Sequence, residues 1–204
     1  MPETLTTGIR WSEAAFRPLW RQELFRSNAI VQARALGPML WRASYRTFPD
    51  RLHVAEAFEA TMQALRGSID TFYGHTARRC RPLHFSGGGL PNLVVHSIRS
   101  DRRAIRINNL PAGLDLARGD FLSITNDQGG RELLRLTTAG SVSSTGLSAW
   151  VDVVPNIRVS VKVGQEVRMV NPVAELRLDP DTLDLVEKAP GAWCVVFSAT
   201  QVVR

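Results

Sequence analysis

Residues 40–74 read LWRASYRTFPDRLHVAEAFEATMQALRGSIDTFYG, and this stretch decides the fold. Leu40–Thr47 alternates polar residues with apolar or aromatic ones, the period of two that is typical of a half-buried strand. Pro49 ends that strand, because proline has no N–H for the ladder and fixes φ. Asp50 is then placed to cap a helix. The stretch therefore predicts a strand, a turn, a helix over residues 50–66 and a second strand.

The predicted helix carries one apolar stripe at helical spacing. The stripe consists of Val54, Phe58, Met62 and Leu65. Gly67 follows it, at a position where a left-handed backbone favours glycine, and Ile69–Tyr73 is the expected second strand. Nearly everything else in the chain has β character, so we expect the stripe to pack on one face of a β-sheet.

Composition places the chain among ordinary globular proteins: 204 residues, 44% hydrophobic and 22% charged. Cys80 and Cys194 lie far apart and form no metal-ligand spacing, which favours two free thiols, although a disulfide between them also fits. Met1–Arg10 is polar and has no apolar core of a signal peptide, so we expect a flexible or partner-ordered arm there. The sequence has no apolar run of roughly 20 residues, and we therefore expect no membrane partner.

The net charge of +6 is unevenly distributed. Up to Leu110 there are 16 arginines and 8 acidic residues, whereas from Pro111 onward 9 basic residues face 11 acidic ones. The arginine clusters at 78–81 and 99–106 lack the interleaved aromatic residues of a single-strand groove and lie on no recognition helix. The charge thus favours a basic face turned toward an acidic protein or toward a lumen through which DNA passes.

Strands flank the organising stretch on both sides. Trp20–Phe25 and Ala29–Leu36 surround the turn residues Ser27 and Asn28 and predict a hairpin. Residues 80–92, with three consecutive glycines, predict an irregular connector. Residues 93–172 then show short strands at regular spacing, as in a small antiparallel barrel or sandwich. Those strands are expected at Val94–Ile98, Ala104–Asn108, Asp120–Thr125, Glu132–Thr138, Ala149–Val154 and Glu166–Val170.

Longer strands return near the C-terminus, at Val173–Leu178 and Ala192–Val203, with a short piece at Leu183–Val186 between them. The last strand is too hydrophobic to remain a free edge, so we expect it to pair inside a sheet. The sequence therefore predicts a mainly β protein. Residues 1–79 and 173–204 form a β-sandwich domain with the helix at 50–66, residues 80–92 form the connector, and 93–172 form an inserted small β-domain.

No catalytic, cofactor-binding or metal-binding residue emerges from the sequence. The histidines make no HExxH or HxH spacing, and there is no GxSxG elbow, Walker loop or dinucleotide fingerprint. His75, Cys80 and His84 share one arginine-rich segment and are the one set that suggests a metal. Three aspartates near the C-terminus, Asp179, Asp181 and Asp184, lack the glycine and terminal glutamate of a calcium loop and are expected in turns.

The order of several short motifs resembles the distal tail proteins of long-tailed, non-contractile bacteriophages and prophages, the Dit-like tail-tip hubs. The resemblance covers most of the chain. Its motifs are Leu40-Trp41-Arg42 with Tyr45, Pro49, Leu65-Arg66-Gly67, Phe72-Tyr73, Gly119-Asp120-Phe121-Leu122, Val154-Pro155-Asn156-Ile157-Arg158 and Asn171-Pro172-Val173-Ala174.

The resemblance implies a structural virion protein at the distal end of the phage tail. In such proteins a β-sandwich belt domain with one helix assembles as a hexamer around the DNA channel. That ring hub joins the tail tube to the tail-tip or baseplate proteins, and fibres or receptor-binding proteins attach to it. The family has no catalytic residues and no cofactor to carry over. The compact middle module leaves little room for a large carbohydrate-binding insertion.

Two other readings remain open. A carbohydrate- or receptor-binding β-sandwich module would use aromatic platforms, with Trp11, Trp20, Trp150 and Trp193 as the candidates, although Trp193 lies in an apolar strand. A hydrolase would use the segment from His75 to Ser86.

Overall fold

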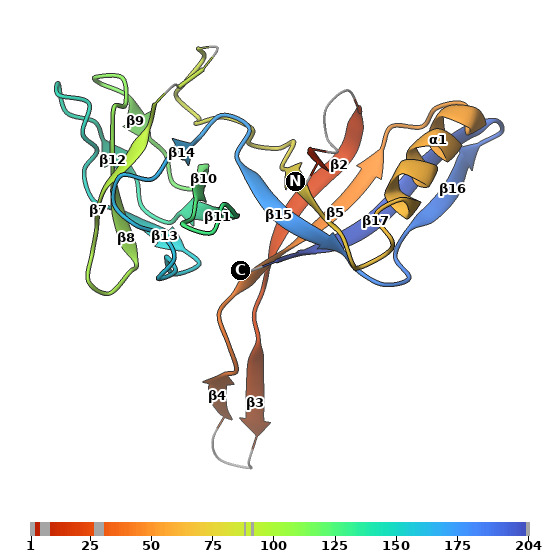
Figure 1. Cartoon of the computed structure of the whole chain (residues 1–204), viewed down its shortest axis with the longest axis horizontal. Coiled ribbons are helices and arrows are strands. Elements are labelled where there is room, and N and C mark those ends of the chain that lie inside the picture. The colour runs from red at the N-terminus through yellow and green to blue at the C-terminus, as the bar shows by residue number, and fades with distance from the viewer. Residues whose placement is uncertain (1–2, 5–8, 27–30, 88, 91, 203–204) are drawn as a thin grey trace.

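The structure is a computed structural model that describes residues 3–4, 9–26, 31–87, 89–90 and 92–202. These residues form two large β-sheets, a two-stranded hairpin that projects from the body, and one helix (Figure 1). The expected mainly β fold class with one packed helix is confirmed.

Seven strands form the first sheet in the described part of the chain. They are β1 (Glu3–Thr4), β2 (Trp11–Leu19), β5 (Leu40–Thr47), β6 (Thr71–His75), β15 (Val173–Leu178), β16 (Asp184–Ala189) and β17 (Ala192–Gln201). The order is β1-β6-β15-β17-β5-β2, with β16 also paired to β17. All pairs are antiparallel except β1 with β6. The strongly apolar β17 thus pairs inside the sheet, as its sequence predicts.

The first sheet curls so that the segment after β6 approaches its far edge. The Ala77 N–H and the Thr76 hydroxyl both donate to the carbonyl oxygen of Ala14 on β2, each at 3.1 Å. These bonds satisfy an acceptor on the outer edge of β2, which lowers the tendency of that edge to pair with another chain.

Helix α1 (Leu52–Gln63) packs on β17 and β16. Its buried residues are Ala55 and Met62, while Phe58 and Leu65 lie partly buried against the same core. The predicted packing of an apolar stripe on a sheet is confirmed, but Val54 at its edge is 43% exposed.

The prediction that Asp50 caps a helix over residues 50–66 is wrong at both ends. Asp50 pairs instead with Trp193, each backbone N–H donating to the other's carbonyl oxygen at 2.8 Å. Arg51 therefore occupies the N-cap, with no side-chain capping bond. The helix ends at Gln63, yet Gly67 does take the expected left-handed conformation, with φ +66°.

The structure also differs from the sequence prediction at three strands. The expected strand at Ile69–Tyr73 begins two residues later, because Arg66 and Asp70 are bonded across the preceding turn. Glu3–Thr4, expected in a flexible or partner-ordered arm, pairs with β6 of its own chain. Strand β2 was not predicted at all, because a bulge between Trp11 and Glu13 and the adjacent small residues Ala14 and Ala15 disturb its alternation.

Six strands form the second sheet, in the order β14-β10-β11-β13-β8-β7. They are β7 (Val94–Ile98), β8 (Ala104–Asn108), β10 (Phe121–Thr125), β11 (Arg131–Leu136), β13 (Val151–Val154) and β14 (Val167–Arg168). Each strand starts and ends within two residues of its predicted bounds. A small pair, β9 (Asp115–Leu116) with β12 (Gly140–Ser141), was not predicted.

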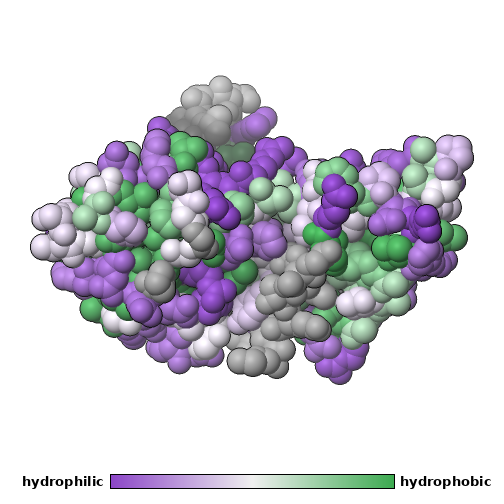
Figure 2. Space-filling model, turned by 90° about the horizontal axis from the view of Figure 1, so that it is seen from above, coloured by the Kyte–Doolittle hydropathy of each residue, from purple (hydrophilic) through white to green (hydrophobic). Residues whose placement is uncertain are grey.

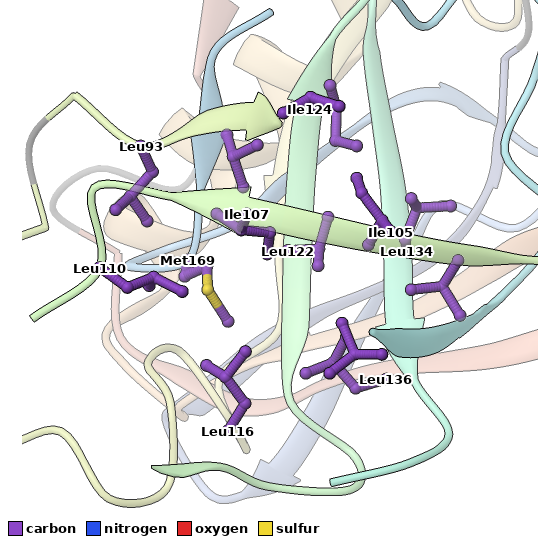
Figure 3. Packing of buried hydrophobic residues seen from close by; sticks show 14 of the residues in the cluster. Leu93, Ile105, Ile107, Leu110, Leu116, Leu122, Ile124, Leu134, Leu136 and Met169 are labelled. Atoms are coloured by element: carbon purple, nitrogen blue, oxygen red, sulfur yellow. The ribbon is translucent and has the colours of Figure 1, made fainter. Parts of the chain in front are cut away.

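The second sheet closes on itself. The Val95 N–H donates to the carbonyl oxygen of Gln165 at 2.9 Å, and the Val167 N–H donates to that of Leu93 at 2.8 Å. These bonds join β7 to the other end of the sheet beside β14, so the sheet is a small antiparallel barrel. Branched aliphatic side chains from facing strands meet in its interior (Figure 3). We call this unit the barrel.

The sheets divide the sequence into three parts. The strands of the first sheet come from residues 3–75 and 173–201, whereas those of the barrel come from residues 94–168. The described residues between 80 and 92 contain neither helix nor strand. The division into an outer domain and an inserted domain stays a prediction.

Trp41 joins the first sheet to the barrel. Its side chain is 1% exposed, and its indole N–H donates to the carbonyl oxygen of Leu133 on β11 at 2.8 Å. The Trp41 ring also contacts the rings of Phe16 on β2 and Phe121 on β10. One side chain therefore packs against both sheets and bonds across their junction.

We expect Trp41→Phe to lower the free energy of unfolding by about 1–3 kcal/mol, because it removes a buried hydrogen bond and part of a buried ring. Chemical denaturation measures this loss. Trp20→Phe is the matched control, since Trp20 is 55% exposed, and it should change the free energy by less than about 0.5 kcal/mol. Equal losses in the two variants would contradict a role for Trp41 at the junction.

Candidate interaction surface

The hairpin of β3 (Gln22–Arg26) and β4 (Val31–Ala35) projects from the body of the molecule (Figure 1). Its antiparallel pairing confirms the hairpin that the sequence predicts. The expected turn at Ser27 and Asn28 lies outside the described residues. The hairpin continues the ribbon of β2 and β5, and the two halves are linked where the Leu36 N–H donates to the carbonyl oxygen of Arg21 at 2.7 Å.

Large apolar side chains on and beside this hairpin face solvent. Trp20 is 55% exposed, Leu24 56%, Phe25 50% and Leu36 56%. A two-stranded hairpin without a core is at best marginally stable in water, and clustered apolar exposure marks interaction sites. We therefore take residues 20–26 and 31–36 as the candidate interaction surface.

The strand register gives this hairpin two different faces. Leu24 lies opposite Ala33, whereas Phe25 lies opposite Gln32 on the other face. Glu23 and Arg34 are also directly opposite, on the Phe25 face. Each face thus carries one large apolar residue, and a partner that covers one face leaves the other exposed.

His75, Cys80 and His84, the set that suggests a metal in the sequence, do not cluster as metal ligands. No group of three or more potential metal ligands occurs among the described residues, although His75, Cys80 and His84 all lie within them. His75 is partly buried, and its carbonyl oxygen accepts the hydroxyl of Tyr45 at 3.2 Å. His84 is exposed. Cys80 and Cys194 are both free thiols.

Asp120 belongs to the motif Gly119-Asp120-Phe121-Leu122, and its contacts hold parts of the fold together. The side chain is completely buried. It accepts the backbone N–H groups of Leu83 and Ala117 at 3.1 and 2.9 Å, and it pairs with Arg79 at 3.2 Å. The carboxylate therefore holds the connector against the barrel.

The arginine clusters are also engaged within the chain. Arg99 pairs with Asp101 and Asp152. Arg102 donates to the carbonyl oxygens of Ile157, Arg158 and Val161. Arg106 lies over the ring of Trp150, 5.6 Å from its centroid. These contacts hold the guanidinium groups of Arg99, Arg102 and Arg106 against other parts of the same chain.

A buried acidic pair lies where the first sheet meets the barrel. Glu132 accepts the Ser160 hydroxyl at 2.8 Å, and Glu175 accepts the Thr71 hydroxyl at 2.9 Å. Burial raises the pKa of Glu132, with Ser160 and Arg158 acting in the opposite direction. Burial also lowers the pKa of Arg158, whose Nε is 3.8 Å from Glu132. This cluster bridges strands, and its Arg158 also lines a hollow of about 490 Å³.

Of the four tryptophans considered for sugar binding, two belong to the core. Trp11 packs against Tyr45, Phe58 and Phe197, and Trp193 packs against the same cluster. Trp20 and Trp150 are the exposed pair, and Arg106 covers one face of Trp150.

No protein-family model matches this sequence, and no curated protein matches it significantly. Within the described residues, no helix combines the length and the apolar character needed to cross a membrane.

We expect Leu24→Ala to change the free energy of unfolding by less than about 1 kcal/mol, because Leu24 is exposed on an unsupported hairpin. The same change at Leu133, which is 0% exposed, should cost about 2–5 kcal/mol because it leaves a cavity. Denaturant titration of the two variants measures both effects. A large loss from Leu24→Ala would show that the hairpin packs within its own chain.

Burial lowers the pKa of His75 below its ordinary value of 6.5. The unfolded chain therefore takes up the proton first as the pH falls, so His75 reduces stability below about pH 6.5. We expect His75→Gln to make the free energy of unfolding fall less steeply between about pH 7.5 and 5.5. His53→Gln, at an exposed helical position, should follow the wild-type slope, and identical slopes in all three proteins would contradict this role of His75.

Proposed function

We propose that this chain is a structural virion protein, a distal tail protein whose copies form a ring hub at the end of a phage tail. In this proposal six copies surround the DNA channel and join the tail tube to the tail-tip proteins. The observation that carries the proposal is the projecting hairpin, because the four large apolar residues exposed on and beside it are suited to contact with another chain.

The positions of the resembling motifs support the proposal. Trp41 and Tyr45 lie in the core of the first sheet, and Phe72 lies beside them. Gly119 and Asn171 have positive φ, +94° and +48°, at the approaches to β10 and β15. The shared motifs are therefore core and turn positions, as expected for a resemblance that concerns architecture rather than chemistry.

A structural role also accounts for the burial and hydrogen bonding of the titratable residues. Asp120, Glu132 and Glu175 are buried and hydrogen-bonded at junctions between parts of the fold. The potential metal ligands of the connector do not converge, as described above. Rigid junctions of this kind suit a component that transmits force between a tube and a tip.

The proposal predicts that the purified chain, alone or with tail-tube protein, forms six-fold rings with an open centre. Negative-stain microscopy gives the symmetry, and light scattering gives a mass six times that of the 22.6 kDa chain. A chain that stays monomeric at high concentration, both alone and with tube protein, would overturn the ring. Glycan binding that is abolished by Trp20→Ala would favour the carbohydrate-binding module instead.

A further inference from the structure

The end of the molecule that carries α1 and β16 is acidic, although the chain as a whole is basic. Residues 50–63 and 179–189 together contain seven acidic and two basic residues, a net charge of −5 within a chain of +6. Residues 20–36, which include the hairpin, contain three arginines and one glutamate, a net charge of +2. The hairpin and the α1–β16 end are therefore electrostatically complementary.

A hollow lies at the acidic end, between the C-terminal end of α1 and the turn that joins β15 to β16. Its volume is about 310 Å³. Leu183 supplies a partly exposed apolar wall, the buried Met62 and Leu178 lie behind it, and the exposed Asp181 is among the lining residues. The other lining carboxylate, Asp179, is already paired with Arg42 at 2.9 Å. Hydrophobic and hydrophilic residues lie side by side at this end of the molecule (Figure 2).

One face of the hairpin has the matching chemistry. Leu24 projects from it beside alanines, because Ala33 lies directly opposite and Ala35 lies opposite Gln22. Arg26 is two residues further along β3 and so shares the face of Leu24. The face therefore presents an aliphatic side chain with a positive charge beside it.

We propose that Leu24 and Arg26 of one copy dock into this hollow of a second copy, with Leu24 against the wall that Leu183 supplies and Arg26 near Asp181. The proposal rests on the ring hub proposed above and names its subunit contact. Within one copy the hairpin leads away from the body (Figure 1). Arg21 at its base approaches the turn at Asp179, where both line another cavity.

This contact is heterologous, since the surface given by one copy differs from the surface that receives it. Heterologous contacts propagate from copy to copy and produce a ring when the rotation closes. The opposite charges at the two surfaces orient the copies head to tail and speed their encounter.

Two variants separate the two surfaces. Leu24→Asp disables the hairpin and leaves the hollow intact, whereas Gln63→Trp fills the hollow from an exposed helix end and leaves the hairpin intact. We expect each variant to be monomeric by light scattering and to keep the circular dichroism spectrum of the wild type. Mixed in equal amounts, they should form a heterodimer of twice the 22.6 kDa chain mass and nothing larger, because only one of the two contacts is functional.

The charged part of the contact is tested by Asp181→Asn, which keeps a residue type that tolerates the left-handed backbone at this position, φ +57°. We expect it to weaken assembly at least several-fold and more at low salt than at high salt. Asp127→Asn, an exposed turn residue of the barrel, is the control and should assemble like the wild type.

The outcomes distinguish this contact from the ring itself. Rings that persist in both Leu24→Asp and Gln63→Trp would overturn the hairpin–hollow contact and leave the hub standing. Monomeric variants that form no heterodimer when mixed would also overturn the contact. A wild-type chain that never assembles, with or without tube protein, would overturn both proposals.

Discussion

The fold depends on the contact that Trp41 makes between two sheets. The strand that carries it, β5, pairs with β17 and β2 in the first sheet, and the Trp41 indole N–H donates to a backbone carbonyl of the barrel. A buried carbonyl acceptor is costly to leave without a donor, so this bond fixes the relative position of the sheets where the rings of Phe16 and Phe121 also meet. The bonds of Asp120 to the connector act at the same junction.

The same strand gives rise to the exposed hairpin. The part of the ribbon nearest the body consists of β2 and β5. These strands lie in the first sheet and bury residues such as Ala14 and Tyr45. Beyond Arg21 the ribbon leaves the sheet, and every described side chain of β3 and β4 whose burial is defined is exposed. The rigid core thereby holds a ribbon in solvent whose large apolar residues have no core of their own, an arrangement that is favourable once a partner covers them.

The sequence predicts local structure well where one pattern acts alone. The barrel strands Val94–Ile98 and Ala104–Asn108 match their predicted ranges, because alternation and turn residues agree there. Prediction fails where distant residues compete with a local preference. Asp50 is a good helix cap by residue type, yet its backbone pairs with Trp193, which follows 143 positions later. That pairing depends on sheet topology, which no local pattern contains.

The candidate surface illustrates the same limit. Alternation around Leu24 and Phe25 predicts a hairpin but does not say whether either face is covered, because a half-buried strand and an exposed one have the same period. The distribution of charge adds information about contacts between copies that the period of two does not contain. The arginines of the hairpin are positively charged, whereas the carboxylates near α1 are negatively charged. A uniform charge over the surface would give two copies no preferred orientation. A separation of charge along one molecule instead favours contacts between unlike ends, and such contacts build closed or open assemblies rather than isolated pairs.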